Sequence, residues 1–377
     1  MRHAAVLDFT SVLYLGLRHT SQSLRPWAQF ATGVPAALAR YPGESKVADM
    51  LATLQGCESA LLAPSTLHLS WDLFGILAKS KIVIYMDAGV YPIVRWGVER
   101  AAALGVPLRT FRHYDIDVLN QMLRQDGLCH RRPLIVSDGM CPGCGKPAPV
   151  AEYLKCARAY NGQLIIDDTQ ALGIFGHAPC PKAPYGRGGG GILQLSKVRG
   201  DDILTVSSLA KGFGVPVAVL SGSIGMIRLF KEKNKTRVHC SPPSIAVVHA
   251  AEHALEVNRT KGDAIRFGLA HLVLYFRKRL KEIGLSATGG LFPVQTLLPV
   301  PGLDVVALHE HLYLKGIRTV LHHGRHGHGV RISFLITAQH SLSDIDKAMA
   351  MLEYAIFHGA DTLKPINQKR SFYTAIV

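Results

Sequence analysis

The chain lacks any apolar run of the roughly 20 residues that a membrane-spanning helix needs. Its first residues also lack the continuous apolar core of a signal peptide, because Asp8, Arg18 and His19 interrupt the apolar stretches. Both absences argue against export and membrane insertion. We therefore expect a cytoplasmic protein without a membrane span.

Cysteine is also scarce, with seven residues in a chain of 377 and no spacing typical of a small disulfide-stapled scaffold. This usage favours reduced thiols in a cytosolic setting. Two of the seven, Cys141 and Cys144, stand in the order Cys-Pro-Gly-Cys. The pair is open to three interpretations, namely two thiols without required chemistry, a reversible disulfide, or part of a metal site.

Of these interpretations, a metal site has the least support. Zinc needs about four ligands, and the chain has no second C-x-x-C to complete a set around Cys141 and Cys144. Four histidines between His322 and His328 could also bind a metal, but the glycines among them favour a mobile loop near the substrate entrance. We therefore expect no metal site.

Acidic residues are few, with 27 Asp and Glu against 42 Lys and Arg and a net charge of +15. Such a balance can mark nucleic-acid binding. The basic residues are scattered, however, except in the segment 231–237, which is typical of a solvated loop or helix end. The alternative is attraction of an anionic substrate such as an acyl-CoA or acyl-carrier protein. We expect no nucleic-acid partner.

One segment, Ser207–Gly214, combines hydroxyls, a lysine and glycines after the apolar run Ile203–Val206, which predicts a buried strand. Lys211 stands among small residues, where partial desolvation lowers the pKa of its amine and makes it nucleophilic toward an aldehyde. The neighbouring hydroxyls and backbone N–H groups can hold a phosphate. Aldehyde and phosphate together indicate pyridoxal phosphate, and the alternative is a surface lysine in a polar loop.

A second segment, Leu164–Gly173, predicts an apolar strand that ends in Asp167 and Asp168. A carboxylate at the carboxyl end of a strand can pair with a protonated pyridine nitrogen. This pairing keeps the ring cationic, so that the ring can act as an electron sink. The alternative is an ordinary acidic corner between a strand and a loop.

These two segments resemble the aspartate and lysine motifs of fold-type I pyridoxal-phosphate enzymes, and most of all those of the α-oxoamine synthase family. That family includes 8-amino-7-oxononanoate synthase, 2-amino-3-ketobutyrate CoA ligase, 5-aminolevulinate synthase and serine palmitoyltransferase. Its pattern D-E-A-H-x-x-G-x-x-G resembles residues 167–176, H-G-R-G resembles 185–188, and T-x-S-K-A-x-G resembles 208–214. The resemblance covers the chain roughly from Tyr41 to Glu353.

The resemblance implies an α/β fold with a central, mostly parallel sheet flanked by helices and a smaller C-terminal α+β domain. The length and the 48% apolar content are enough for two such domains. We place an N-terminal arm, which includes a helix, at 1–42, the large cofactor-binding domain at 43–255 and the small domain at 256–377. The resemblance also implies a homodimer with the active site at its interface.

The same resemblance assigns roles around the cofactor. Lys211 would form the internal aldimine and later move a proton at the substrate Cα, and Asp167 would keep the pyridine nitrogen protonated. Tyr91 would stack on the ring in place of the family's histidine, so that acid–base assistance from an imidazole is lost. Gln170 replaces a second histidine and would contact the phenolic oxygen. Asp138 resembles the family's acidic residue near the cofactor.

Further residues are assigned to the cofactor phosphate and the substrate. Ser65 and Thr66 lie where a strand-to-helix turn holds the phosphate in the family, although ordinary helix capping explains either residue equally well. Ser208 is a further candidate beside the lysine. Ser241 would contact the phosphate of the partner subunit, and Arg331 would bind the α-carboxylate of the substrate with its forked guanidinium.

The resemblance predicts a transferase that condenses an amino acid with an acyl thioester, carried by coenzyme A or an acyl-carrier protein. An aminotransferase or another pyridoxal-phosphate enzyme is the first alternative, since it needs the same Lys211, Asp167 and Arg331. The second is an inactive subunit of the same fold, although such a subunit has no need of Lys211.

Overall fold

The structure is a computed structural model that describes residues 6–39, 41–126, 130–323 and 329–357. It divides into two compact units. The larger unit contains residues 17–141 and 147–263, and the smaller unit contains 1–16, 142–146 and the chain from 264 onward. The helix α9 (Ile245–Glu282) belongs to both, since the division falls after Asp263, a little beyond the predicted boundary at 255.

The larger unit is built around a seven-stranded sheet with the strand order β2-β8-β7-β6-β5-β3-β4. The strands are β2 (Ser59–Ala63), β3 (Ile82–Asp87), β4 (Leu108–Phe111), β5 (Arg132–Asp138), β6 (Gln163–Asp167), β7 (Ile203–Ser208) and β8 (Ala218–Gly222). Only β8 runs against its neighbours, so the predicted mostly parallel sheet is confirmed.

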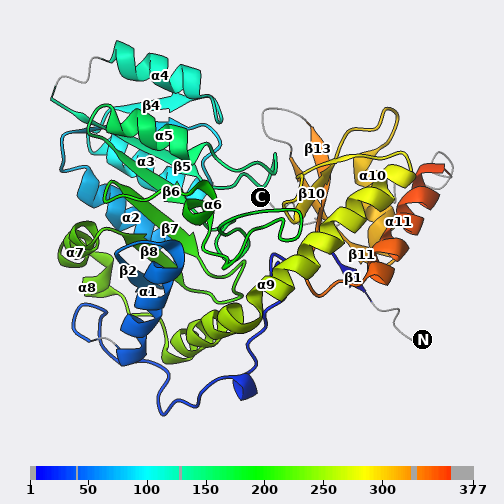
Figure 1. Cartoon of the computed structure of the whole chain (residues 1–377), viewed down its shortest axis with the longest axis horizontal. Helices are drawn as coiled ribbons and strands as arrows, with labels where there is room; N and C mark the ends of the chain where they lie inside the picture. The colour runs from blue at the N-terminus through cyan, green and yellow to red at the C-terminus, as the bar shows by residue number, and fades with distance from the viewer. Residues whose placement is uncertain (1–5, 40, 127–129, 324–328, 358–377) are drawn as a thin grey trace. The chain divides into compact units, whose positions relative to one another are not determined.

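Helices cover both faces of this sheet (Figure 1). They are α1 (Pro42–Gln55), α2 (Thr66–Leu77), α3 (Pro92–Ala103), α4 (Ile116–Gln125), α5 (Val150–Arg158), α6 (Ile192–Ser196), α7 (Ile224–Lys233), α8 (Thr236–His239) and the first part of α9.

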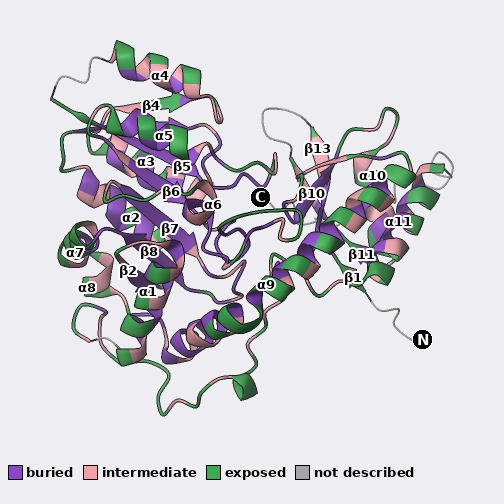
Figure 2. Cartoon of the chain, viewed as in Figure 1, coloured by how far each residue is buried: buried purple, intermediate pink, exposed green. Residues whose placement is uncertain are grey.

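Apart from the edge strand β4, the strands form apolar runs because they are buried on both faces, as Figure 2 shows. Successive side chains of a strand point to opposite faces. In β2, Leu61 and Ala63 join an apolar cluster with α2, α3 and α7, whereas Ala60 and Leu62 join a second cluster with α1 and α9. The two clusters fix the sheet between two helical layers.

The smaller unit has its own antiparallel sheet with the order β12-β13-β10-β9 and a short parallel pair, β1 with β11. Its strands are β1 (Leu7–Asp8), β9 (Ala287–Thr288), β10 (Val294–Leu297), β11 (Ile317–Arg318), β12 (Val320–His323) and β13 (Val330–Leu335). Its helices are the second part of α9, α10 (Val305–Leu314) and α11 (Leu342–Phe357). This unit is the predicted α+β domain.

The N-terminal segment differs from the prediction of an arm that includes a helix. Within residues 6–39 it forms strand β1 and a single 3-10 turn, η1 (Ser21–Ser23). Pro26, Gly33 and Pro35 punctuate this segment and disfavour a continuous helix. Residues 324–328 of the predicted histidine loop lie outside the described residues. Among the described helices, none is long and apolar enough to cross a membrane.

Candidate active site

Strands β5, β6 and β7 end side by side, and three predicted site residues lie at or just beyond their carboxyl ends. Asp138 closes β5 and Asp167 closes β6, and the strand register pairs these two residues. Lys211 follows three residues after the end of β7. Because neighbouring parallel strands share one carboxyl edge, the lysine and both carboxylates gather where open α/β sheets bind ligands.

The amine of Lys211 is partly withdrawn from water in the turn after β7. Burial lowers the pKa of Lys211, while the negative charges of Asp167 and Asp138 act in the opposite direction. The amine therefore has a larger neutral fraction than a surface lysine at the same pH. The Lys211 Nζ lies 5.6 Å from the centroid of the Tyr91 ring. A neutral amine placed in this way can attack a carbonyl carbon.

The carboxyl group of Asp167 is buried, with 6% of the residue's surface exposed. Burial raises the pKa of Asp167, and hydrogen bonds from Thr169 and the positive charge of Lys211 oppose this effect. The Thr169 N–H donates to its Oδ1 at 2.9 Å. A buried carboxylate of this kind is stabilised by one more cationic N–H group, which a protonated pyridine nitrogen would supply.

The next residue, Asp168, binds the start of helix α6 instead of facing Lys211. Both of its carboxylate oxygens accept from the N–H of Ile192, at 3.0 and 3.1 Å, at the start of α6. The residue is fully buried, and burial raises the pKa of Asp168. Asp168 thus fixes the end of the glycine-rich segment 188–191. Asp167, in contrast, is the carboxylate that interacts with the charge of Lys211.

Tyr91 reaches the site because it immediately precedes α3, whose first residue is Pro92. Its N–H donates to Oδ1 of Asp138 at 3.1 Å. The end of β5 therefore holds the backbone of Tyr91, while the ring lies next to Lys211. The structure brings together Lys211, Tyr91, Asp138 and Asp167, and their roles toward a cofactor stay predictions.

Ser65 and Thr66 stand at the N-terminus of α2, directly after β2. Strands β2 and β7 both run antiparallel to β8 and so end at the same edge of the sheet. The Ser65 hydroxyl accepts from the His68 N–H at 3.5 Å and lies 2.8 Å from the His68 Nδ1. Ser65 is thus a helix cap, and the N–H groups of the first turn of α2 face the carboxyl edge, where an anion is stabilised.

Thr169 is a site residue that the sequence analysis missed. Its hydroxyl accepts from the Ser208 N–H at 3.0 Å, and its own N–H donates to Asp167. The Ser208 hydroxyl in turn accepts from the Ala210 N–H at 3.2 Å. Thr169 therefore links the ends of β6 and β7 and positions the turn that carries Lys211. The available signal was a threonine two residues after a strand-ending carboxylate.

Two other predicted residues have less support from this geometry. Gln170 is buried in the turn after β6. Ser241 is exposed beyond α8, and its side chain forms no hydrogen bond with any residue that the structure describes. The predicted role of Ser241 concerns a partner subunit and stays a prediction.

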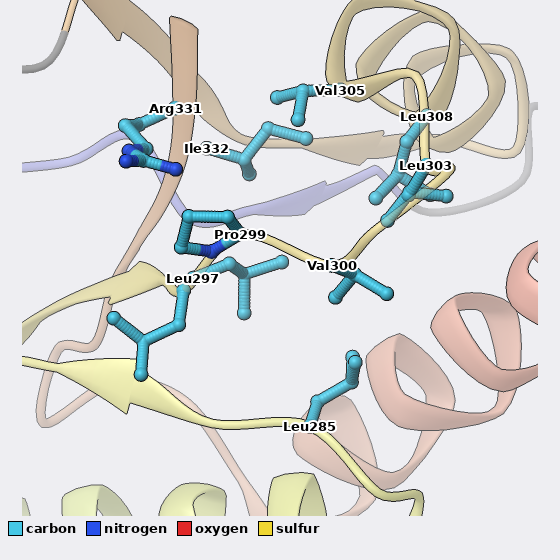
Figure 3. A pocket seen from close by; sticks show the side chains of 10 residues that line it. Leu285, Leu297, Pro299, Val300, Leu303, Val305, Leu308, Arg331 and Ile332 are labelled. Atoms are coloured by element: carbon cyan, nitrogen blue, oxygen red, sulfur yellow. The ribbon is translucent and has the colours of Figure 1, made fainter. Parts of the chain in front are cut away.

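Arg331 lies in the smaller unit, on β13, where it is paired with His322 of β12. It borders an apolar pocket (Figure 3). The other lining residues are Leu285, Leu297, Leu298, Pro299, Val300, Leu303, Val305, Leu308 and Ile332. No described residue forms an ion pair with the Arg331 guanidinium. A cationic fork beside an apolar hollow suits a carboxylate ligand.

Comparisons with known proteins identify the family and the fold of the chain. The family model for aminotransferases of class I and II matches residues 37–352. The chain is 25% identical over 360 residues to 8-amino-7-oxononanoate synthase 1 of Bacillus velezensis, a match that covers 93% of this chain and 88% of the relative.

Solved structures show the same fold. A serine palmitoyltransferase with a pyridoxal-phosphate internal aldimine matches with a TM-score of 0.80 and 14% identity, over 94% of this chain and 88% of that one. The 8-amino-7-oxononanoate synthase of Francisella tularensis matches with a TM-score of 0.71 and 17% identity, over 94% and 99%. The predicted resemblance to α-oxoamine synthases and the predicted fold-type I architecture are confirmed.

Proposed function

Because the chain belongs to the aminotransferase class I and II family, we propose that it is a pyridoxal-phosphate-dependent transferase that condenses an amino acid with an acyl thioester. The 8-amino-7-oxononanoate synthase and serine palmitoyltransferase relatives support this type of reaction. The observation that carries the proposal is Lys211, an amine with a lowered pKa beside Asp167 and Asp138 at the carboxyl edge of the sheet.

The residues at this edge fit pyridoxal phosphate. Lys211 offers an amine for the aldehyde, and Asp167 offers a buried negative charge for the pyridine nitrogen. Tyr91 offers a ring face, and Ser65 and Thr66 offer a helix N-terminus for the phosphate. When bound, the cofactor supplies the electron sink for a carbanion at the substrate Cα.

Two residues of this chain handle protons. The lowered pKa of Lys211 lets its amine accept a proton from the substrate Cα and return it, because the neutral form is populated nearer to neutral pH. Asp167 would be stabilised as the anion by a protonated pyridine nitrogen of the bound cofactor, and would in turn favour that protonation. Tyr91 stands where an imidazole assists in the family, and it contributes a ring face in place of that imidazole.

We assign the substrate carboxylate to Arg331, whose guanidinium borders an apolar pocket and has no ion-pair partner among the described residues. A bidentate hydrogen bond between the guanidinium and a carboxylate would orient the amino acid. We also propose a cytoplasmic homodimer, with coenzyme A or an acyl-carrier protein as the acyl carrier and Ser241 as a phosphate contact across the interface.

The test measures thiol release from acyl thioesters in the presence of pyridoxal phosphate and a panel of amino acids. We expect thiol release that depends on an amino acid and is lost in Lys211→Ala, but not in the exposed control Lys182→Ala. We also expect a visible absorbance band that borohydride traps on Lys211. Trapping that persists in Lys211→Ala would overturn the role of this lysine.

The family model leaves an aminotransferase as the second candidate, since it describes that class. The same assay separates the two reactions. An aminotransferase would transfer the amino group to a 2-oxo acid without consuming the thioester. A protein that binds the cofactor but turns over neither substrate pair would be the inactive subunit.

A further inference from the structure

A second polar cluster lies at the carboxyl edge of the same sheet, centred on Asp87, the last residue of β3. Its carboxylate is almost fully buried, with 1% of the residue exposed. One oxygen accepts from the Gly89 N–H at 2.6 Å and bonds His113 Nδ1 at 2.8 Å. The other accepts from the Tyr114 N–H at 2.9 Å and from the Tyr153 hydroxyl at 3.0 Å. The proposed function uses none of these groups.

Asp87 fixes the orientation of the His113 ring. Because an ionised carboxylate only accepts hydrogen bonds, the Nδ1 of His113 must donate to it. With Nδ1 held by Asp87, the His113 side chain also forms a hydrogen bond with the Cys141 thiol. This carboxylate–histidine arrangement is the one that supports metal-binding histidines, since the carboxylate sets the tautomer and the ring position.

The thiol of Cys141 lies next to this histidine. Cys141 comes three residues after Asp138, at the end of β5, and β5 is the neighbour of β3 in the sheet. The Sγ of Cys141 and a ring nitrogen of His113 lie within 4.8 Å of each other. Cys141 is buried, while the side chain of His113 is 20% exposed and leaves a route for a small ion.

The sequence adds a second thiol. Cys144 follows Cys141 in the C-x-x-C spacing, in which the chain between the two cysteines is short enough for both sulfurs to reach one ion. Sulfur and imidazole together select a soft or borderline cation such as Zn²⁺ over Mg²⁺ or Ca²⁺. The structure thus supplies a histidine ligand for the C-x-x-C, which has no second C-x-x-C to complete it in the sequence.

We propose that His113, Cys141 and Cys144 bind one Zn²⁺ ion, with Asp87 as the positioning residue behind His113. Three protein ligands leave the fourth coordination position of a tetrahedral ion to water. The ion would tie the end of β5 to the segment after β4. The site shares no residue with the proposed cofactor site and goes beyond the proposed transferase activity.

The experiment uses the full-length protein purified under reducing conditions, freed of metal by a chelator and dialysed against Zn²⁺. Elemental analysis gives the stoichiometry, and competition with a chromophoric chelator gives the affinity. Replacement of Zn²⁺ with Co²⁺ adds a spectroscopic readout, since thiolate ligands give Co²⁺ an intense near-ultraviolet charge-transfer band. None of these measurements depends on pyridoxal phosphate or on turnover, so the proposed function can fail without affecting them.

We expect one Zn²⁺ per chain and a thiolate band with Co²⁺. Cys141→Ser and Cys144→Ser should each lose stoichiometric metal and weaken the Co²⁺ band, whereas the exposed Cys180→Ser should behave like the unaltered protein. Asp87→Asn should weaken binding by about 10–100-fold, the usual effect of removing a carboxylate behind a metal-bound histidine.

The proposal is overturned if the unaltered protein binds no stoichiometric Zn²⁺, or if Cys141→Ser and Cys144→Ser bind it as tightly as Cys180→Ser does. A Cys141–Cys144 disulfide in the purified protein that resists reduction would also overturn it. Circular dichroism shows which variants are folded. Cys144→Ser serves as the decisive variant if replacement of the buried Cys141 unfolds the protein.

Discussion

Two carboxylates, Asp87 and Asp167, end parallel strands on either side of β5 and are both nearly excluded from water. Burial acts to raise the pKa of each. At Asp87, hydrogen bonds from His113 and from the N–H groups of Tyr114 and Gly89 outweigh burial and hold the pKa below its usual value. At Asp167, fewer hydrogen bonds form and burial prevails, so the pKa is raised.

The two carboxylates differ in how far the protein itself satisfies their charge. Asp87 has its hydrogen-bond acceptors filled by the protein and uses its charge to orient His113. Asp167 interacts with Lys211 and with Thr169, but these interactions stabilise its charged form less than burial destabilises it. A cationic cofactor group would complete the environment of Asp167, whereas Asp87 needs none.

The largest expected effect comes from the lysine beside Asp167. Lys211→Ala should lower thiol release by at least about 10²–10⁴-fold, the contribution of a positioned acid–base group. Lys182→Ala, which alters an exposed lysine of the same unit, should leave the rate unchanged. Steady-state rates at saturating pyridoxal phosphate check this prediction. An equal loss in both variants would mean that the two lysines do not differ in the way described.

Neutralising Asp167 should have the second-largest effect on the rate. Asp167→Asn should lower the rate by about 10²–10³-fold, because a charge that stabilises the protonated ring nitrogen is lost. The stability of the cofactor-free protein should change little, since burial already disfavours the charge at this position. Rates and urea unfolding of the same preparation test both parts. A rate close to that of the unaltered protein would remove Asp167 from the reaction.

The same substitution at Asp87 should lower the stability of the protein, unlike the substitution at Asp167. Asp87→Asn should destabilise the metal-free protein by about 1–3 kcal/mol, because an amide cannot accept all the hydrogen bonds that reach this buried carboxylate. Urea unfolding of the metal-free protein checks this value. Asp201→Asn, at an exposed position, serves as the control and should unfold like the unaltered protein.

The smallest effect extends the comparison to a second buried histidine, His309. In the smaller unit, the Nδ1 of His309 lies 2.9 Å from the Thr319 hydroxyl, and burial lowers the pKa of His309 below the ordinary 6.5. The unfolded chain then binds a proton that the folded protein excludes. Stability is therefore complete above pH 6.5 and declines as the pH falls below it.

Replacing His309 should weaken the dependence of the melting temperature on pH. In His309→Gln, the loss of melting temperature between pH 7.5 and 5.5 should be smaller than in the unaltered protein, by about 1–3 °C. Differential scanning calorimetry at the two pH values measures it. The exposed control His271→Gln should keep the original pH dependence. An unchanged slope in His309→Gln would mean that this histidine does not contribute.

The sequence already predicted much of the fold and of the site. Lys211 and Asp167 followed from their positions at or just past the ends of apolar runs. The mostly parallel sheet, Asp138 and Tyr91 followed from the resemblance to α-oxoamine synthases. The helix expected in the N-terminal arm was wrong. Backbone groups of that segment bond to distant partners instead, for example the Phe9 N–H to the carbonyl of Arg318.

The sequence by itself determined which residues close each strand, because apolar burial and polar ends are local properties of the chain. Only the tertiary structure decided which of those ends are neighbours. Strand order places β3 between β5 and β4, and so brings Asp87, His113 and Cys141 together, although Cys141 stands 28 positions after His113 in the chain. Likewise, the Thr169–Ser208 bond exists because β6 and β7 are adjacent. The local pattern of apolar residues does not determine strand order, so the contacts between strand ends are known only from the folded structure.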